Sequence, residues 1–332
     1  MSFMMIEEKL NNKSEHLCVW KEPDGYMMFD SYFSNDKCRI FIITNIVHNY
    51  LWLKKNLDNI RENDYFLVYH WWFQDDNLAR QSAAVIDTLK LNKSKFIPLC
   101  NDYKELQHFL YYGFENAIQF NQNAWLDENL IKIIPNEKIY DAILISRAVP
   151  AKRIHLANKV DKLAFLSSSQ DPNIPLPNHI NEKIKVPYNE VCTYINQSKC
   201  GLILSPVEGA CYASSEYLLS GVPVVSTKSL GGRDLWYTEE NSIICEDNED
   251  AVKDAVIEII SKKIDPYKIR NKHIAVSKYF RNIFISKIDE IFKNHNISID
   301  SRRYFNNKFY NKMYKFISCD VASNIMKDVQ YE

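Results

Sequence analysis

Glycine is rare in this chain and strongly clustered. The 332 residues contain 7 glycines, and 5 of them fall between Gly201 and Gly232. Because glycine is otherwise avoided, these positions are predicted to be places where the backbone turns sharply or comes close to a ligand. The stretch reads as an apolar run at 202–204, a turn that holds Glu208 and Gly209, a segment of helical length at 212–220, and a second apolar run at 223–225. This order predicts a βαβ unit, in which ligands bind at the carboxyl ends of the strands.

Two acidic side chains flank the predicted helix of this unit. Glu208 follows the first strand, and Glu216 lies eight positions on, about two turns into the helix and on a similar face. The free N–H groups at a helix N-terminus bind anions, so the local design suits a ligand that carries phosphate beside hydroxyl groups. Taken alone, Glu208 is also explained as a solvated helix cap and Glu216 as an exposed helix residue.

The spacing of these residues resembles a known family. Glu208 and Glu216, followed by Gly-Val-Pro-Val-Val and then Gly-Gly, resemble the donor-site signature of retaining GT-B glycosyltransferases. Upstream, the run YDAILISRAVPAKRIHLA is similar to that family's strand that ends in Arg with a Lys five residues later, here Arg147 and Lys152. A third segment, FNQNAWLDENLIKIIP, resembles the junction between the two domains but keeps only Asn123 of the usual Asn-Gly-Val-Asp run.

The resemblance implies a fold and a reaction. The fold is α/β, of the GT-B type, with two Rossmann-like domains whose parallel sheets face a central cleft. The reaction moves a sugar from a nucleotide diphosphate sugar to a hydroxyl acceptor with retention of configuration, without a bound metal or other cofactor. A GT-B nucleotide-sugar epimerase and a non-catalytic GT-B subunit are the alternatives.

The resemblance also assigns roles to individual residues. Glu208 contacts the donor sugar and Glu216 the ribose hydroxyls, and Glu208 can stabilise the positive charge that builds on the sugar ring. A single carboxylate cannot carry out an inverting or double-displacement mechanism that needs two carboxylates. Arg147 and Lys152 stabilise the charge of the leaving diphosphate. The donor site continues through the start of the helix, with Gly209, Ala210, Cys211 and Tyr212.

Two positions depart from the family pattern. Cys211 stands where a second glycine usually follows the first glutamate, which leaves the backbone geometry there open. Leu235 stands where an acidic residue often follows the Gly-Gly pair, and Asp234 comes one step early. Arg153 and His155, in the same helical turn as Lys152, are weaker candidates for phosphate contact.

The overall composition restricts the function classes. A length of 332 residues predicts two domains. With 41 basic and 42 acidic side chains there is no charge bias of the kind that marks a dedicated nucleic-acid binder. The 8 cysteines include no Cys-x-x-Cys pair, so neither a zinc site nor a disulfide framework is predicted. A reducing, cytoplasmic setting is predicted instead. Neither a signal peptide nor a membrane-spanning run is expected.

Apolar runs alternate with helix-length segments along the chain, as in parallel α/β layers. We expect an acceptor-side domain at 1–132, a nucleotide-sugar domain at 133–298 and a helical tail at 299–332. The predicted strands are 39–44, 65–70, 95–100, 117–120, 141–146, 162–166, 183–186, 201–205, 222–226 and 242–245.

The first domain offers weaker signals. His70 closes a strand where some family members keep a sugar-contacting histidine, and Asn45 and His48 follow the preceding strand. Trp71 belongs to an aromatic cluster that is interpreted either as core or as an acceptor platform, since sugars pack on aromatic faces. A lone histidine in such a position is more often structural. Asp75-Asp76 is not an Asp-x-Asp metal motif.

The tail is basic and aromatic. Residues 302–316 carry five cations and no acidic residue among several aromatic side chains. One interpretation is an amphipathic helix on an anionic membrane, which would bring a glycan or lipid-linked acceptor of surface polysaccharide synthesis close to the site. This would make the protein peripheral on the inner membrane face. The other is a helix that crosses back onto the first domain and packs its aromatics there.

Overall fold

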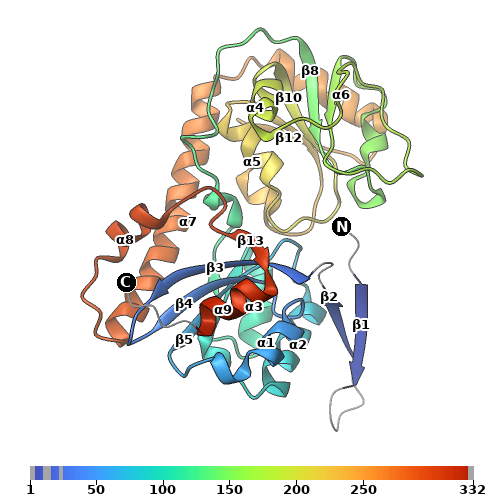
Figure 1. Cartoon of the computed structure of the whole chain (residues 1–332). Coiled ribbons are helices and arrows are strands. Elements are labelled where there is room, and N and C mark those ends of the chain that lie inside the picture. Colours follow the sequence, from blue (N-terminus) through green and yellow to red (C-terminus); the bar gives the residue numbers. More distant parts are fainter. Residues whose placement is uncertain (1–3, 10–15, 22–24, 328–332) are drawn as a thin grey trace. The chain divides into compact units, whose positions relative to one another are not determined.

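The computed structural model describes residues 4–9, 16–21 and 25–327 (Figure 1). The chain forms two compact units: unit 1 comprises Met1–Trp125 and Phe280–Glu332, and unit 2 comprises Leu126–Tyr279. The long helix α7 (Pro266–Asn294) begins in unit 2 and ends in unit 1. The unit limits therefore lie at 125 and 279, whereas the sequence analysis placed them at 132 and 298.

Unit 1 is built on a mixed sheet with the strand order β13-β3-β4-β5-β6-β7. Strands β4 to β7 run parallel, and β3 and β13 join antiparallel at one side. The strands are β3 (Tyr26–Ser34), β4 (Arg39–Thr44), β5 (Asp64–Tyr69), β6 (Phe96–Cys100), β7 (Ile118–Gln119) and β13 (Lys315–Ser318). The helices are α1 (Tyr50–Lys55), α2 (Asp76–Thr88), α3 (Tyr103–Tyr111), α8 (Ser301–Lys308) and α9 (Cys319–Lys327).

Both faces of this sheet are covered, which explains why β4, β5 and β6 are buried at every position. One face packs against α1, α2, α3 and α9 through a single hydrophobic cluster. The other face carries an aromatic layer beneath α7 and α8, in which Tyr32 meets Phe284 with ring centroids 5.5 Å apart. Side-chain caps fix the starts of α2 and α3, because Asp75 and Asp102 each accept a hydrogen bond from a backbone N–H three residues on.

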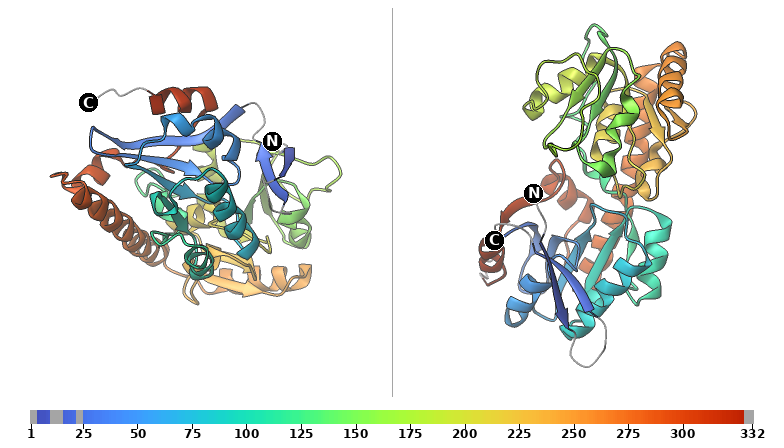
Figure 2. Two further views of the ribbon diagram at one scale, coloured as in Figure 1. Left: turned by 90° about the horizontal axis from the view of Figure 1, so that it is seen from below. Right: turned by 90° about the vertical axis from the view of Figure 1, so that its right-hand side faces the viewer.

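Unit 2 has a parallel sheet with the order β12-β11-β10-β8-β9. The strands are β8 (Tyr140–Ile145), β9 (Leu163–Leu166), β10 (Ser198–Ile203), β11 (Val224–Thr227) and β12 (Ser242–Cys245). The helices besides α7 are α4 (Tyr188–Asn196), α5 (Tyr212–Leu219) and α6 (Glu249–Ser261), and helices flank the sheet in the further views of Figure 2. The chain moves from β8 to β9 on one side and then to β10 on the other. The carboxyl ends of β8 and β10 therefore form a topological switch point, where such folds bind ligands.

Glycine is required at two positions of this unit. A Cβ at Gly201 in β10 would lie 2.1 Å from the ring of Tyr217, so the helix α5 packs on the strand only because the side chain is missing. Gly221, just after α5, has a φ of +69° and would place a Cβ 2.6 Å from Pro266. The clustered glycines thus serve close packing of the βαβ unit as well as its turns.

Each predicted strand except one is present, with limits that differ by up to three residues. The exception is 183–186, and this prediction is wrong: the segment contains no strand. The side chain of Asn181 occupies the edge of β9 instead, since it accepts from Phe165 N at 2.7 Å and donates to Phe165 O at 2.9 Å. Strands β3 and β13 were not predicted, nor was the antiparallel pair of β1 (Met4–Lys9) and β2 (His16–Lys21).

The tail belongs to unit 1. The prediction of one amphipathic helix over 302–316 is wrong, because α8 ends at Lys308 and a strand begins at Lys315. Phe305 is buried, and the hydroxyl of Tyr304 donates to Tyr32 O at 2.8 Å. The aromatic side of α8 therefore packs on the first unit, as in the crossover interpretation. Arg302, Arg303 and Lys308 remain exposed, and contact with a membrane stays a prediction.

Candidate functional site

Three loops at the carboxyl edge of the unit 2 sheet carry the candidate site. Arg147 and Lys152 follow β8, Glu208 follows β10, and Arg233 follows β11. These strands are neighbours, so their loops lie together at one edge. The loops after β10 and β11 are also tied directly, because Glu208 N donates to Leu230 O and Leu230 N donates to Pro206 O, both at 2.9 Å.

Lys152 and Glu208 form an ion pair at the switch point. The Lys152 ammonium donates to Glu208 Oε1, and the Ser205 hydroxyl donates to the same oxygen at 2.6 Å. The Glu208 side chain is 7% exposed and that of Lys152 is 16% exposed. A buried charge needs a partner of opposite sign. The Lys152 ammonium and the Glu208 carboxylate are such partners for each other. Arg147, on the same loop as Lys152, is exposed.

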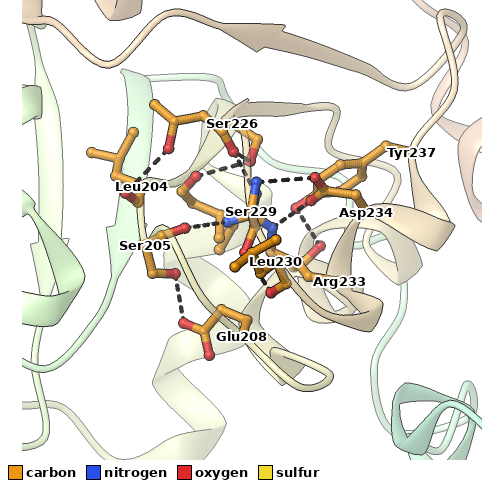
Figure 3. A network of polar contacts seen from close by, with 12 residues as sticks. Leu204, Ser205, Glu208, Ser226, Ser229, Leu230, Arg233, Asp234 and Tyr237 are labelled. Atoms are coloured by element: carbon orange, nitrogen blue, oxygen red, sulfur yellow. Dashed lines mark hydrogen bonds and ion pairs between the residues drawn. The ribbon is translucent and has the colours of Figure 1, made fainter. Parts of the chain in front are cut away.

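Arg233, on the loop after β11, has no exposed surface. Figure 3 shows the network around it. One guanidinium nitrogen donates to Ser205 O at 2.9 Å, another donates to Thr227 O, and Nε donates to Asp234 Oδ1 at 2.7 Å. Ser205 lies just beyond the end of β10 and Thr227 is the last residue of β11, so both carbonyls lie where the sheet runs out of donors. The buried guanidinium therefore joins the ends of β10 and β11.

Arg153 serves a similar structural purpose. Its Nε donates to Leu204 O at 2.7 Å, and its two other nitrogens donate to Thr227 Oγ1 and Asp247 Oδ2. Its backbone lies in the left-handed region with a φ of 47°. Arg153 thus uses all of its side-chain nitrogens in bonds that hold the ends of β10 and β11 to the residues after β12, and it stabilises this edge of the sheet. His155, the other weak candidate, is exposed.

Helix α5 begins beside the ion pair. Cys211 immediately precedes it and has a φ of 65°, the left-handed conformation that glycine adopts without strain. The structure thus places a cysteine in the backbone geometry expected of the glycine it replaces. Burial, together with the nearby Glu208 carboxylate, raises the pKa of the Cys211 thiol to about 12, so it stays protonated. Gly209 and Ala210 complete the turn between Glu208 and the helix, and Tyr212 is its first residue.

Glu216 lies in α5 and is buried. The hydroxyl of Tyr188, at the start of α4, donates to Glu216 Oε1 at 3.0 Å. Tyr188 itself is 43% exposed. A half-exposed aromatic ring thus lies next to the second glutamate of the predicted donor site. Tyr188 is not among the site residues predicted from the sequence.

The candidate acceptor residues of unit 1 divide into buried and exposed. Asn45 is buried and donates to Gln74 Oε1 at 3.0 Å. His70 has no exposed surface, its ring stacks on Phe109, and burial lowers its pKa to about 3. Burial also lowers the pKa of His48, to about 4, so both imidazoles are neutral near pH 7. Trp71, by contrast, is 37% exposed, and the neighbouring Trp72 is 43% exposed.

A buried carboxyl group supports the tryptophan loop. Glu105 has no exposed surface, and its two oxygens accept from Gln74 N at 2.9 Å and Asn101 N at 2.6 Å. Asn101 in turn donates to His70 O at 3.0 Å. The backbone on both sides of Trp71 is therefore held in place. Burial raises the pKa of Glu105 to about 8, so the group is mainly protonated at neutral pH.

This shift predicts a pH-dependent contribution to stability. The unfolded chain ionises Glu105 near pH 4.5, whereas the folded chain keeps its proton up to about pH 8. The contribution of protonated Glu105 to the stability of the folded state is therefore fully present below pH 4.5 and is lost as the pH rises through 8. We expect Glu105→Gln to lower the free energy of unfolding at pH 5. The difference from wild type should then shrink by on the order of 2 kcal/mol between pH 5 and pH 9. Urea unfolding at both pH values measures this, with the exposed Glu115→Gln as control. A difference that is constant with pH contradicts the assignment.

Several site residues carried no sequence signal strong enough to identify them. Arg233 and Tyr188 contact partners that are distant in sequence, Ser205 and Glu216 respectively. Ser205 and Arg233 both lie close to the motif, at the end of the predicted strand 201–205 and directly after the Gly-Gly pair, but neither carries a recognisable pattern of its own. Among residues 4–9, 16–21 and 25–327, no group of three or more His, Cys, Asp or Glu residues is arranged to hold a metal ion. No helix in the described part of the chain is long and apolar enough to cross a membrane.

Comparison with known proteins gave a family match within unit 2. The family described as "Glycosyl transferases group 1" matches residues 168–276, which include Glu208, Glu216 and Arg233. A search of curated proteins found no significant match.

Solved structures similar to the chain include TarM, HepE and a trehalose-6-phosphate phosphatase domain, each with a TM-score above 0.5. TarM of S. aureus has a TM-score of 0.51 at 14% identity, over 68% of this chain and 50% of that chain. HepE of Anabaena, in complex with UDP, has 0.53 at 12%, over 75% and 78%. The trehalose-6-phosphate phosphatase N-terminal domain of Candida albicans has 0.54 at 10%, over 75% and 70%. This chain therefore spans about half the length of the TarM chain. It has the GT-B fold with two Rossmann-like units, and its residues 168–276 match the glycosyl transferases group 1 family.

Proposed function

We propose that the protein is a retaining, metal-independent glycosyltransferase. It transfers a sugar, such as a hexosyl group, from a nucleotide diphosphate sugar to a hydroxyl of a glycan or lipid-linked acceptor. The observation that carries the proposal is the Lys152–Glu208 ion pair at the switch point of β8 and β10, beside the start of α5. Opposite charges here match the two charges that separate when a glycosyl phosphate bond breaks.

The positive groups of the site suit the diphosphate. Lys152 lies on the loop after β8, Arg147 is exposed on the same loop, and the first N–H groups of α5 face the carboxyl edge of the sheet. Ammonium, guanidinium and helix N-terminus are all favourable partners for phosphate oxygens. The ion pair with Lys152 neutralises Glu208. When a donor binds, the same ammonium can turn its remaining N–H bonds to the diphosphate, so no metal ion is needed to balance the charge.

Glu208 is placed to act as a fixed negative charge. Both hydrogen bonds that it accepts from Lys152 and Ser205 go to Oε1, which leaves Oε2 for the sugar. A carboxylate held in this way stabilises the positive charge that develops on the sugar ring, and it does so without reorganising. Retention of configuration is proposed from the spacing of Glu208 and Glu216, which resembles that of retaining enzymes.

The nucleoside part of the donor is proposed to lie at Glu216. The carboxylate accepts from Tyr188, and a carboxylate can also accept from both hydroxyls of a ribose. The similar structure of Anabaena HepE contains UDP, which supports a nucleoside diphosphate as part of the ligand.

The acceptor is proposed to be a sugar or sugar-lipid of surface polysaccharide synthesis. Trp71 and Trp72 are exposed after β5, at the carboxyl edge of the unit 1 sheet, and the network of Glu105 holds their loop. Exposed aromatic rings on a rigid loop suit the C–H faces of a sugar. His70 would need to become exposed before it could touch an acceptor.

A binding screen followed by turnover tests the proposal. Nucleoside diphosphates and their sugars are screened for a rise in melting temperature, because a ligand of the folded state stabilises it by mass action. The best donor is then incubated with and without acceptor sugars, and with a chelator, while NMR follows the anomeric signals. We expect a transfer product with the donor's configuration, unaffected by the chelator. A product of inverted configuration would overturn retention, and strict dependence on Mg²⁺ or Mn²⁺ would overturn metal independence. An epimerised donor without acceptor would overturn glycosyl transfer itself.

A further inference from the structure

Besides the Lys152 ammonium, a buried serine hydroxyl holds the Glu208 carboxylate. Ser205 is 2% exposed, and its hydroxyl donates to Glu208 Oε1 at 2.6 Å. Its carbonyl accepts from Arg233 at 2.9 Å. One residue thus links the carboxylate on one side to the buried guanidinium on the other, as Figure 3 shows.

From this geometry we propose that Ser205 and Arg233 are positioning residues for Glu208, which set the direction of its free oxygen. The proposal rests on the proposed function, in which Glu208 faces the donor sugar. Neither residue contacts the substrate. They act through the backbone turn 205–208 and through the hydroxyl of Ser205.

The burial of Arg233 is costly, and this cost indicates a specific structural role. A guanidinium with no exposed surface loses its hydration, and one carboxylate of Asp234 compensates the charge only in part. A hydrophobic residue of similar volume could fill the space but could not donate to Ser205 O and Thr227 O at once. The planar, forked guanidinium fixes the loop after β10 relative to the end of β11 at the point where ladder bonds stop.

The same segment also reaches helix α5. Arg233 lies over the ring of Tyr237 at 5.8 Å, and the Tyr237 hydroxyl shares a hydrogen bond of 2.8 Å with Ser214 of α5. The segment 232–237 therefore contacts the loop of Glu208 and the end of β11 through Arg233, and the first turn of α5 through Tyr237. These three segments surround the proposed donor site, so a shift in any of them would move the carboxylate relative to the sugar.

Ser205→Ala is the first test, and Ser226→Ala is its matched control. Ser226 is also a buried serine, but its hydroxyl donates to Ile203 O and Thr227 O and does not contact Glu208. We expect Ser205→Ala to lower kcat about tenfold or more, with KM for the donor changed less than about threefold, because a hydrogen bond to a charged group is lost. Ser205→Thr keeps a hydroxyl and is expected to recover most of the rate. Ser226→Ala should keep the wild-type kcat.

Arg233→Lys tests the second half of the proposal. It keeps the charge but cannot bridge two carbonyls, so we expect kcat to fall by at least about tenfold while donor KM stays within about threefold. If this variant fails to fold, the Ser205 series still decides the question. The proposal is wrong if Ser205→Ala matches Ser226→Ala in kcat, or if KM rises while kcat is unchanged. Wild-type protein without turnover on any donor would instead refute the proposed function, so the two failures are distinguishable.

Discussion

Glu208→Gln is expected to lower kcat about a hundredfold or more and to leave the affinity for the donor nearly unchanged. The substitution removes the negative charge that is proposed to face the sugar ring in the transition state, and preorganised charges of this kind contribute about 3 to 4 kcal/mol to catalysis. Binding should hold or improve, because Lys152 loses its carboxylate partner and its ammonium becomes fully available to the diphosphate. Single-turnover rates together with donor titration by calorimetry separate these two effects.

Glu239→Gln is the matched control for this experiment, since Glu239 is an exposed glutamate of the same unit. It should retain wild-type kcat and melting temperature. A Glu208→Gln enzyme with wild-type turnover would contradict the catalytic role. A variant that binds donor poorly but turns over normally at saturation would move Glu208 from the transition state to ground-state binding.

The strands were predictable because of how they are buried. β4 and β5 have apolar centres and are buried at every position, as expected for strands covered on both faces, and the predicted limits differ by at most one residue. The strand predicted at 183–186 was wrong. The side chain of Asn181 bonds to the backbone of Phe165 at that sheet edge, and the backbone bond from Ser167 N to Ile184 O does not continue into a ladder. Side-chain hydrogen bonds of this kind leave no periodic signal.

The same distinction applies to the candidate site. Lys152 and Glu208 follow strands that motif spacing identifies, so their proximity could be expected from the βαβ topology. Ser205 and Arg233 were missed because their importance lies in individual hydrogen bonds, from the Ser205 hydroxyl to Glu208 and from Arg233 to the carbonyls of Ser205 and Thr227, which leave no periodic pattern in the sequence. The tail shows a further limit. Its aromatic residues fit a membrane surface and a protein core equally well, and only packing, such as the contact of Tyr304 with Tyr32, distinguishes the two.

The second large effect is expected for Lys152→Ala. The ammonium is proposed to stabilise the charge that grows on the leaving diphosphate, so its removal should cost about 3 kcal/mol or more of transition-state stabilisation, roughly a hundredfold in kcat/KM. The variant also leaves the buried Glu208 carboxylate with the hydrogen bond from the Ser205 hydroxyl but without its cation. A buried carboxylate without its cation destabilises the fold, and we therefore expect a lower melting temperature as well.

Two further variants separate these consequences of losing Lys152. Lys159→Ala removes a lysine of the same unit whose ion pair with Asp250 is half exposed, and it should change neither kcat nor stability appreciably. The double variant Lys152→Ala with Glu208→Gln removes both charges, so its melting temperature should recover while its activity stays low. Recovery occurs because the uncompensated charge is gone, whereas catalysis needs both groups. If added Mg²⁺ restored Lys152→Ala to wild-type rates, the diphosphate charge would be neutralised by metal, and the role proposed for Lys152 would be wrong.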